Sequence, residues 1–206
     1  MTKIKKQRET PYAILTPISE RWSPRAFMAD SIDRETLRII FEAARLAPSA
    51  FNAQPWSFII GIKGDTTWDS ILSTLIPFNQ QWASTAPVLI LACGNTRSED
   101  GNHDNAYFQY DCGQALAYLS IQAMEKGVYT HQMAGFNKEL AKNSFSLPTD
   151  IIPLTITAMG YPGNIEDIPE SMHQQEKEIK PRKEFPTFVF TNKFGVPSEL
   201  FNSSIE

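Results

Sequence analysis

The sequence predicts a layered fold of the α/β or α+β class. Apolar residues recur at helical spacing over residues 34–47, and a continuous apolar run, PVLILAC, occupies residues 87–93. Further stretches of both kinds alternate along the chain. Because a helix or a strand must bury its apolar face against another element, such alternation indicates helices packed on a sheet.

The strongest helix signal covers residues 34–47. Asp33 offers an N-cap, Glu35 lies in the first turn, and Pro48 ends the segment. A second long helix is predicted over residues 105–126, where Gly127 is well placed as the C′ residue. Shorter helices are expected at residues 17–21, 66–75 and 137–143.

Four segments read as strands. Residues 56–62 are rich in aromatic and β-branched side chains, and residues 87–93 look like a strand buried on both faces. An apolar strand is predicted at residues 152–159, before Gly160 and Gly163, and a short one at residues 128–130.

Composition excludes several classes of protein. The chain has 206 residues, 42% of them hydrophobic, and a formal net charge of -4, as in ordinary globular proteins. A mildly acidic chain lacks the clustered Lys and Arg that bind nucleic acid, and no apolar run is long enough to span a membrane. The segment after the polar N-terminus lacks the apolar core of a signal peptide, so we expect a cytoplasmic protein.

The familiar nucleophile, nucleotide and metal motifs are missing from the sequence. There is no GxGxxG, P-loop, HExxH, CxxC or GxSxG, and the three histidines are scattered. Cys93 and Cys112 read as buried reduced thiols, with a disulfide or redox pair as the alternative. If the chain is an enzyme, a bound organic cofactor is expected to perform the difficult chemical step.

The C-terminal residues 181–206 differ from the rest. Five apolar side chains cluster there without a supporting helix: Phe185, Phe188, Val189, Phe190 and Phe194. The segment could tuck under its own chain or form an arm that docks on a partner subunit.

Two stretches carry a family resemblance. Residues 21–27 read RWSPRAF, and residues 43–56 read AARLAPSAFNAQPW. In this order and at this separation they resemble the signature of the nitroreductase family, and weaker matches extend the resemblance over roughly residues 15–190. It implies an α+β sandwich, mainly antiparallel, as a single domain over residues 1–206, with a C-terminal arm at 181–206 that extends onto the partner subunit. Residues 1–10 precede the matching segments and read as a flexible tail.

The resemblance implies FMN as cofactor and places its phosphate. Arg21, Ser23 and Arg25, with Trp22 between them, fall in the segment that the family uses for the phosphate and ribityl chain. Guanidinium groups suit a phosphate because they bind it bidentately. A basic pair near the C-terminus, Lys180 and Arg182, is expected to join them. The alternative is that all four cations are solvated surface charges.

Three further groups of residues are expected to contact the flavin ring. The family uses a loop of the partner subunit here, which corresponds to Pro48, Ser49, Ala50 and Asn52, so the site would be shared across a homodimer. Asn79 would approach the ring, and the backbone of Met133, Ala134 and Gly135 would lie near flavin N5. Ordinary turn chemistry is the alternative for Ser49, Asn52 and Asn79.

This chain departs from the family pattern at two of these positions. Ala50 replaces a common serine, and Met133-Ala134 replace a common acidic residue, which leaves the redox tuning of the flavin open. His131 could touch a substrate or serve as a hydrogen-bonded structural residue. The aromatic side chains of Trp22, Phe51, Tyr107 and Phe108 could line the substrate pocket or simply pack.

The activity implied is that of an FMN-dependent oxidoreductase. Hydride would pass from NADH or NADPH through the flavin to a small electron-poor acceptor such as a nitroaromatic or a quinone. Two alternatives remain: a protein that stores flavin or senses redox state, and a family variant that runs dehalogenation, oxidation or flavin breakdown. No metal site, nucleic acid or membrane is expected.

Overall fold

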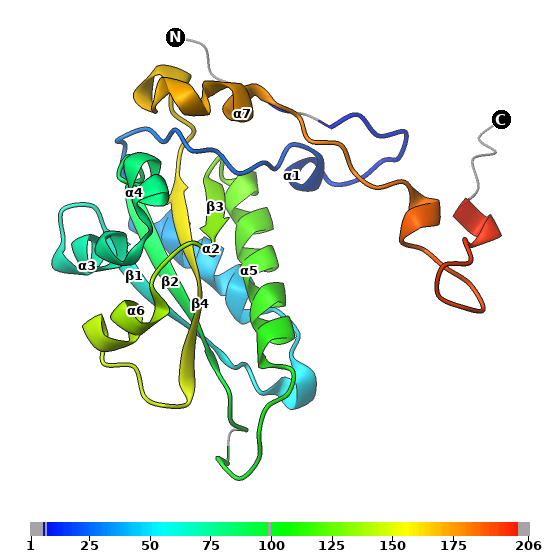
Figure 1. Cartoon of the computed structure of the whole chain (residues 1–206), viewed down its shortest axis with the longest axis horizontal. Helices are drawn as coiled ribbons and strands as arrows, with labels where there is room; N and C mark the ends of the chain where they lie inside the picture. Colours follow the sequence, from blue (N-terminus) through cyan, green and yellow to red (C-terminus); the bar gives the residue numbers. More distant parts are fainter. Residues whose placement is uncertain (1–5, 7, 99, 202–206) are drawn as a thin grey trace.

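The structure is a computed structural model that describes residues 6, 8–98 and 100–201 of the chain (Figure 1). The parts of the predicted tail and arm at residues 1–5, 7 and 202–206 lie outside the described residues. In the described residues a four-stranded sheet carries helices on both faces. This is the expected α+β architecture.

All three strand pairings of the sheet are antiparallel. The strands are β1 (Trp56–Ile62), β2 (Val88–Asn95), β3 (Tyr129–Met133) and β4 (Ile151–Gly160), in the order β1-β2-β4-β3. The two central strands therefore come from distant parts of the sequence. The register of β2 on β4 shifts between Ala92 and Cys93, which indicates a bulge there.

Side chains alternate between the two faces of β2. Val88 and Ile90 belong to one buried cluster, and Leu89 and Leu91 belong to the other. All four are at most 1% exposed, so β2 is buried on both faces as the sequence predicts.

Two long helices cover one face of the sheet. They are α2 (Arg34–Arg45) and α5 (Phe108–Glu125), which pack on each other and on the cluster that contains Val88 and Ile90. The other face carries α3 (Thr66–Thr74), α4 (Pro77–Ala83) and α6 (Lys138–Ser144). The sheet is thus the middle layer of three.

Local sequence signals fix the ends of several helices. Asp33 caps α2, because its side chain accepts a hydrogen bond from the backbone N of Thr36 at 2.8 Å. Gly127 follows α5 with a φ of 69°, the left-handed conformation expected of a C′ glycine. The predicted helix and strand bounds agree with the structure to within a few residues at these and the other elements.

The sequence did not predict α4 or the short α7 (His173–Lys177). Each has fewer than eight residues, so helical periodicity has little room to show. Tertiary contact stabilises α4 instead: the Trp82 side chain is fully buried in the core.

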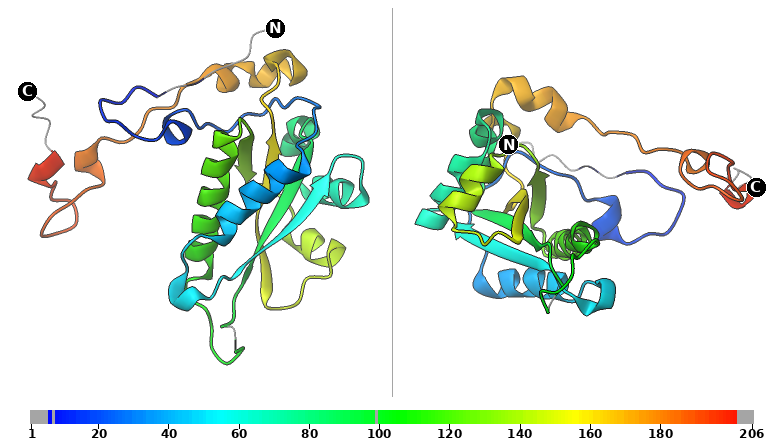
Figure 2. Two further views of the ribbon diagram at one scale, coloured as in Figure 1. Left: turned by 180° about the vertical axis from the view of Figure 1, so that it is seen from behind. Right: turned by 60° about the horizontal axis from the view of Figure 1, so that its bottom comes forward.

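Both ends of the chain leave the sheet together. The N-terminal segment with α1 (Thr16–Ser19) and the segment after α7 run side by side away from the helical layers (Figures 1 and 2). The aromatic residues at the far end contact one another and Tyr12, whose ring centroid lies 5.9 Å from that of Phe185. Phe194 is 95% exposed and Leu200 is 89% exposed. The C-terminal segment therefore does not tuck under the sheet.

Candidate functional site

A cavity of about 250 Å³ gathers the predicted phosphate residues. It lies where the segment before α2, strand β3 and the segment after α7 meet. The predicted residues that line it are Arg21, Trp22, Ser23, Arg25, Lys180 and Arg182. Sequence reasoning missed six further lining residues, which come from the N-terminal segment and from the region of α7 and just after it: Lys6, Arg8, Gln175, Glu176, Glu178 and Ile179.

Backbone contacts hold the arginine-bearing segment in place. Phe27 forms an isolated antiparallel bridge with Pro162, and the backbone N of Gly163 donates to the carbonyl of Ala26 at 2.9 Å. A Cβ atom at Gly163 would lie 2.8 Å from the Phe27 carbonyl carbon, so only glycine permits this approach. The segment is thereby fixed to the end of β4.

Two carboxylates, Glu176 and Glu178, line the cavity, yet most of its arginines form no ion pair among the described residues. Within the part of the chain that the structure describes, Arg25 forms an ion pair with Glu176 at 3.5 Å, whereas Arg8, Arg21 and Arg182 form none. Burial, and then the charge of Arg182, lower the pKa of Arg21. Like charges held together without partners are a preformed binding site for an anion.

Glu176 has a structural role in this cavity. Its side chain is buried, accepts a hydrogen bond from the backbone N of Arg25 at 2.8 Å, and contacts the Arg25 guanidinium. Arg25 is therefore held by a carboxylate of the same chain, and Arg21 and Arg182 are the freer guanidinium groups.

His131 lines the same cavity from β3. Its Nδ1–H donates to the carbonyl of Pro24 at 2.9 Å, and its ring centroid lies 4.3 Å from that of Trp82. Burial lowers the pKa of His131 to about 4, and the charges of Arg25 and Arg21 act in the same direction. The imidazole is therefore neutral near pH 7 and anchors the arginine-bearing segment to the sheet.

A second hollow of about 360 Å³ adjoins the arginine cavity and shares Arg21 and Ser23 with it. Its lining includes apolar side chains, Ile18, Ala117 and Ile121, and a polar group between α5 and β3. The hydroxyl of Ser120 accepts a hydrogen bond from Thr130 at 3.0 Å and one from the Gln132 side chain at 3.3 Å. This hollow can therefore hold a chain of hydroxyl groups next to an anion.

Asn79 and the segment after β3 form a separate group. The Asn79 side-chain amide donates to the carbonyl of Gly135 at 3.0 Å, and a Cβ at Gly135 would lie 2.8 Å from that amide nitrogen. Met133 is buried, whereas Ala134 is exposed. The structure thus brings together Asn79 and Gly135, two of the residues expected near the flavin ring.

The loop of Pro48, Ser49, Ala50 and Asn52 lies elsewhere. The backbone N of Ala50 donates to the Asp111 carboxylate at 3.1 Å near the start of α5. Ser120, which lines the polar hollow, is nine residues further along α5, or roughly 14 Å at 1.5 Å per residue. None of the loop residues lines the arginine cavity of its own chain.

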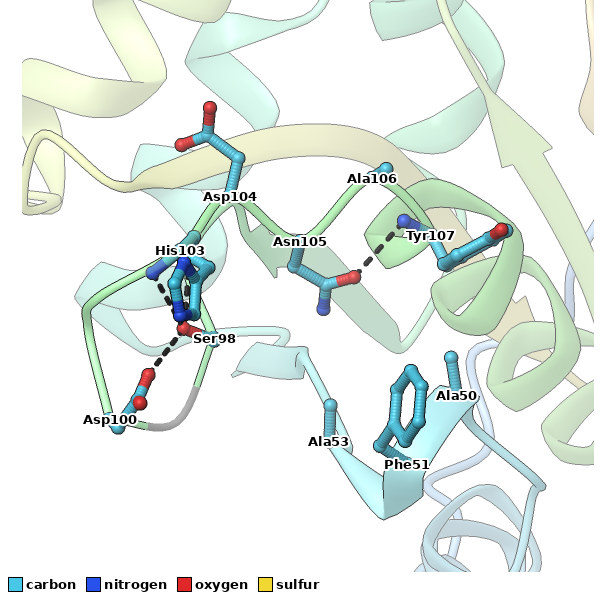
Figure 3. Close-up of a pocket in the computed structure, with 10 residues that line it drawn as sticks. All are labelled: Ala50, Phe51, Ala53, Ser98, Asp100, His103, Asp104, Asn105, Ala106 and Tyr107. Atoms are coloured by element: carbon cyan, nitrogen blue, oxygen red, sulfur yellow. Dashed lines mark hydrogen bonds between the residues drawn. The ribbon is translucent and has the colours of Figure 1, made fainter.

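Strained backbone presents the side chain at the tip of this loop. Phe51 and Asn52 have φ values of 54° and 59°, which are unfavourable for a phenylalanine. Phe51 is fully exposed, and Figure 3 shows its ring at the edge of a pocket of about 600 Å³. The opposite wall is the loop before α5, with Tyr107, which sequence reasoning considered for a substrate pocket, and Asn105, which it did not single out.

The described residues contain neither a metal-binding cluster nor a membrane-spanning helix. No group of three or more His, Cys, Asp or Glu side chains there could hold a metal ion. No helix in this part of the chain is long and apolar enough to cross a membrane.

Comparison with known proteins identifies the family. The model of the nitroreductase family matches residues 18–66 and 62–161, about two thirds of the chain. The chain belongs to the nitroreductase family. A crystal structure described as an oxidoreductase containing FMN has a TM-score of 0.85 at 30% identity, covering 92% of this chain and 96% of the other. An NADH dehydrogenase of Thermus thermophilus is 25% identical, covering 71% of this chain and 85% of its own length.

A further member supports the fold. A nitroreductase family protein from Clostridium difficile 630 has a TM-score of 0.67 at 24% identity, over 86% of this chain and 96% of its own. The resemblance, and the mainly antiparallel sheet that it implied, are confirmed.

Proposed function

We propose that this nitroreductase-family chain is an FMN-dependent oxidoreductase. In this proposal it passes hydride from NADH or NADPH through the flavin to a small electron-poor acceptor, such as a nitroaromatic or a quinone. The observation that carries the proposal is the arginine cavity, where Arg8, Arg21 and Arg182 meet without a carboxylate partner among the described residues.

The cavity and its neighbour fit the two polar parts of FMN. A phosphate monoester of charge near -2 would satisfy the unpaired guanidinium groups and the hydroxyl of Ser23. The ribityl hydroxyls would lie along the polar hollow that Ser120, Thr130 and Gln132 line. Because Arg21 and Ser23 line both spaces, one molecule can occupy both.

The ring would be held by two subunits. Asn79 and Gly135 would supply polar contacts from one chain, and the loop of Pro48, Ser49, Ala50 and Asn52 would come from the partner of a homodimer. Two observations support this arrangement: the loop is remote from the arginine cavity of its own chain, and it carries the fully exposed Phe51. Leaving such an apolar aromatic side chain in contact with water costs free energy.

The chain needs no acid or base of its own for this reaction. Bound FMN would supply the hydride chemistry, and the protein would bind, orient and bias the ring. His131 is neutral near pH 7 and donates its Nδ1–H to Pro24, so its role is to position the phosphate-binding segment. Met133 and Ala134 provide no carboxylate, and only backbone groups would face N5 from there.

Anaerobic reduction tests the proposal. NADH or NADPH, added to protein reconstituted with FMN, is expected to bleach the visible flavin bands, and a nitroaromatic or quinone should restore them. Flavin that neither nicotinamide reduces would contradict the proposed reaction and favour a storage or sensor protein.

Sedimentation tests the shared site. At micromolar protein concentration it should give twice the chain mass of 23.2 kDa, and a monomer would exclude a site shared between two subunits.

A further inference from the structure

We propose that Arg8 is a phosphate-binding residue and that an anion in the arginine cavity fastens the N-terminal segment to the body of the protein. The inference rests on the proposed function for the identity of the natural anion, a phosphate monoester. The family resemblance assigns no role to this segment.

Direct contacts place Arg8 at the junction of three segments. Its backbone N donates to the carbonyl of Ser19 at 3.2 Å, and its Nη1 donates to the carbonyl of Arg21 at 2.6 Å. Lys6 donates to the carbonyl of Glu178 at 2.7 Å, and its Nζ lies 4.3 Å from the centre of the Trp22 ring. The N-terminal segment thus lies between the segment that bears Arg21 and the segment that leads to Arg182.

The Arg8 guanidinium has hydrogen-bonding capacity to spare. An arginine has five N–H groups, and among the described residues the Arg8 guanidinium donates one hydrogen bond, to the Arg21 carbonyl. Its Nε is buried without a hydrogen-bond partner, and the side chain lines the cavity. Unsatisfied donors of this kind are costly unless a ligand completes them.

Charge gives the second argument. Burial lowers the pKa of Arg8, and the charges of Arg182 and Arg21 lower it further, while no described carboxylate pairs with it. Docking of the N-terminal segment therefore places the Arg8 guanidinium near those of Arg21 and Arg182, and the three positive charges repel one another. A dianion between them would turn this repulsion into attraction, so anion binding and docking of the segment should stabilise each other.

Binding of FMN and riboflavin tests the role of Arg8, since the two flavins differ by the phosphate. In Arg8→Ala, FMN affinity should fall about 10- to 100-fold, the effect of one hydrogen bond to a charged group, while riboflavin affinity stays unchanged. Arg8→Lys should lie between wild type and Arg8→Ala. The exposed Arg34, changed to Ala, controls for the loss of one positive charge. Unchanged FMN affinity in Arg8→Ala, or an equal loss for both flavins, would overturn the proposal.

Hydrogen exchange tests the fastening without flavin. Inorganic phosphate, added to wild-type apoprotein, should slow amide exchange in the peptide that contains Arg8, relative to chloride of equal ionic strength. Equal exchange in both salts would overturn the coupling, even if the variants fail to fold. The two proposals fail separately: wild type that does not bind FMN contradicts the proposed function, whereas the exchange experiment with phosphate still decides whether an anion fastens the N-terminal segment.

Discussion

Acid should destabilise the protein through one buried imidazole. His131 has a folded pKa of about 4 against an ordinary value of 6.5, and burial is the main cause. Between these two values the unfolded chain binds a proton that the folded chain does not. The resulting stability is fully present above about pH 6.5 and is lost as the pH falls toward 4.

The size of the effect follows from the shift. Each unit of pKa difference is worth about 1.4 kcal/mol, so the limit is about 3 kcal/mol. Between about pH 7.5 and pH 5, linkage predicts a loss of about 2 kcal/mol from His131 alone. Arg25 and Arg21 face the ring and add to the shift, whereas the hydrogen bond to the Pro24 carbonyl opposes it.

Urea unfolding at these two pH values measures this loss. Carboxylates also titrate near pH 5, so the informative quantity is the difference between wild type and His131→Asn at one protein concentration without flavin. Asparagine keeps a donor for the Pro24 carbonyl but cannot titrate. The variant should be less stable at both pH values, and its dependence on pH should be smaller by about 2 kcal/mol.

The same substitution at an exposed histidine serves as the control. His103 is exposed, and His103→Asn should keep the full pH dependence of wild type. Equal pH dependence in wild type and His131→Asn would refute the reasoning, because it would mean that the imidazole takes up its proton in the folded state as readily as in water.

Three further results are expected. Gly61→Ala should lower the free energy of unfolding by roughly 1–3 kcal/mol in urea titrations, because its Cβ would lie 2.4 Å from the Trp68 Cα; an unchanged midpoint would contradict this. Gly113→Ala, with open space at that Cβ on α5, should instead raise it by roughly 0.5–1 kcal/mol, and a loss would contradict the helix assignment. Burial raises the pKa of Cys93 to about 11 and of Cys112 to about 12. Both thiols should therefore react with a disulfide reagent at pH 8 only after urea is added, and fast labelling of native protein would contradict the packing.

Local sequence signals account for most of the predicted elements. Asp33 and Pro48 mark the ends of α2, and the apolar run at 87–93 marks β2, because caps, breakers and periodicity act within a few residues. The strand order came from the family resemblance. No local signal shows that β2 pairs with both β1 and β4.

The candidate site was predicted only in part. The motif at residues 21–27 located the arginine cavity, yet Glu176 was missed because it meets Arg25 from 151 residues away. Arg8 was missed because a short basic run near a chain end looks like any solvated tail. Phe51 and Tyr107 were considered as substrate-pocket residues, but the rest of the pocket beside Phe51 was missed because two loops form it, and loops carry little periodicity.

Calorimetric titration of apoprotein with FMN and with riboflavin tests the central claim most directly, since the claim is that the arginine cavity binds the phosphate of a flavin. Wild type should bind FMN at least about 100-fold more tightly than riboflavin, as expected for two or more charged hydrogen bonds. Arg21→Ala should remove most of that preference and leave riboflavin binding unchanged. Equal affinity of wild type for the two flavins, or no binding of either, would contradict the account.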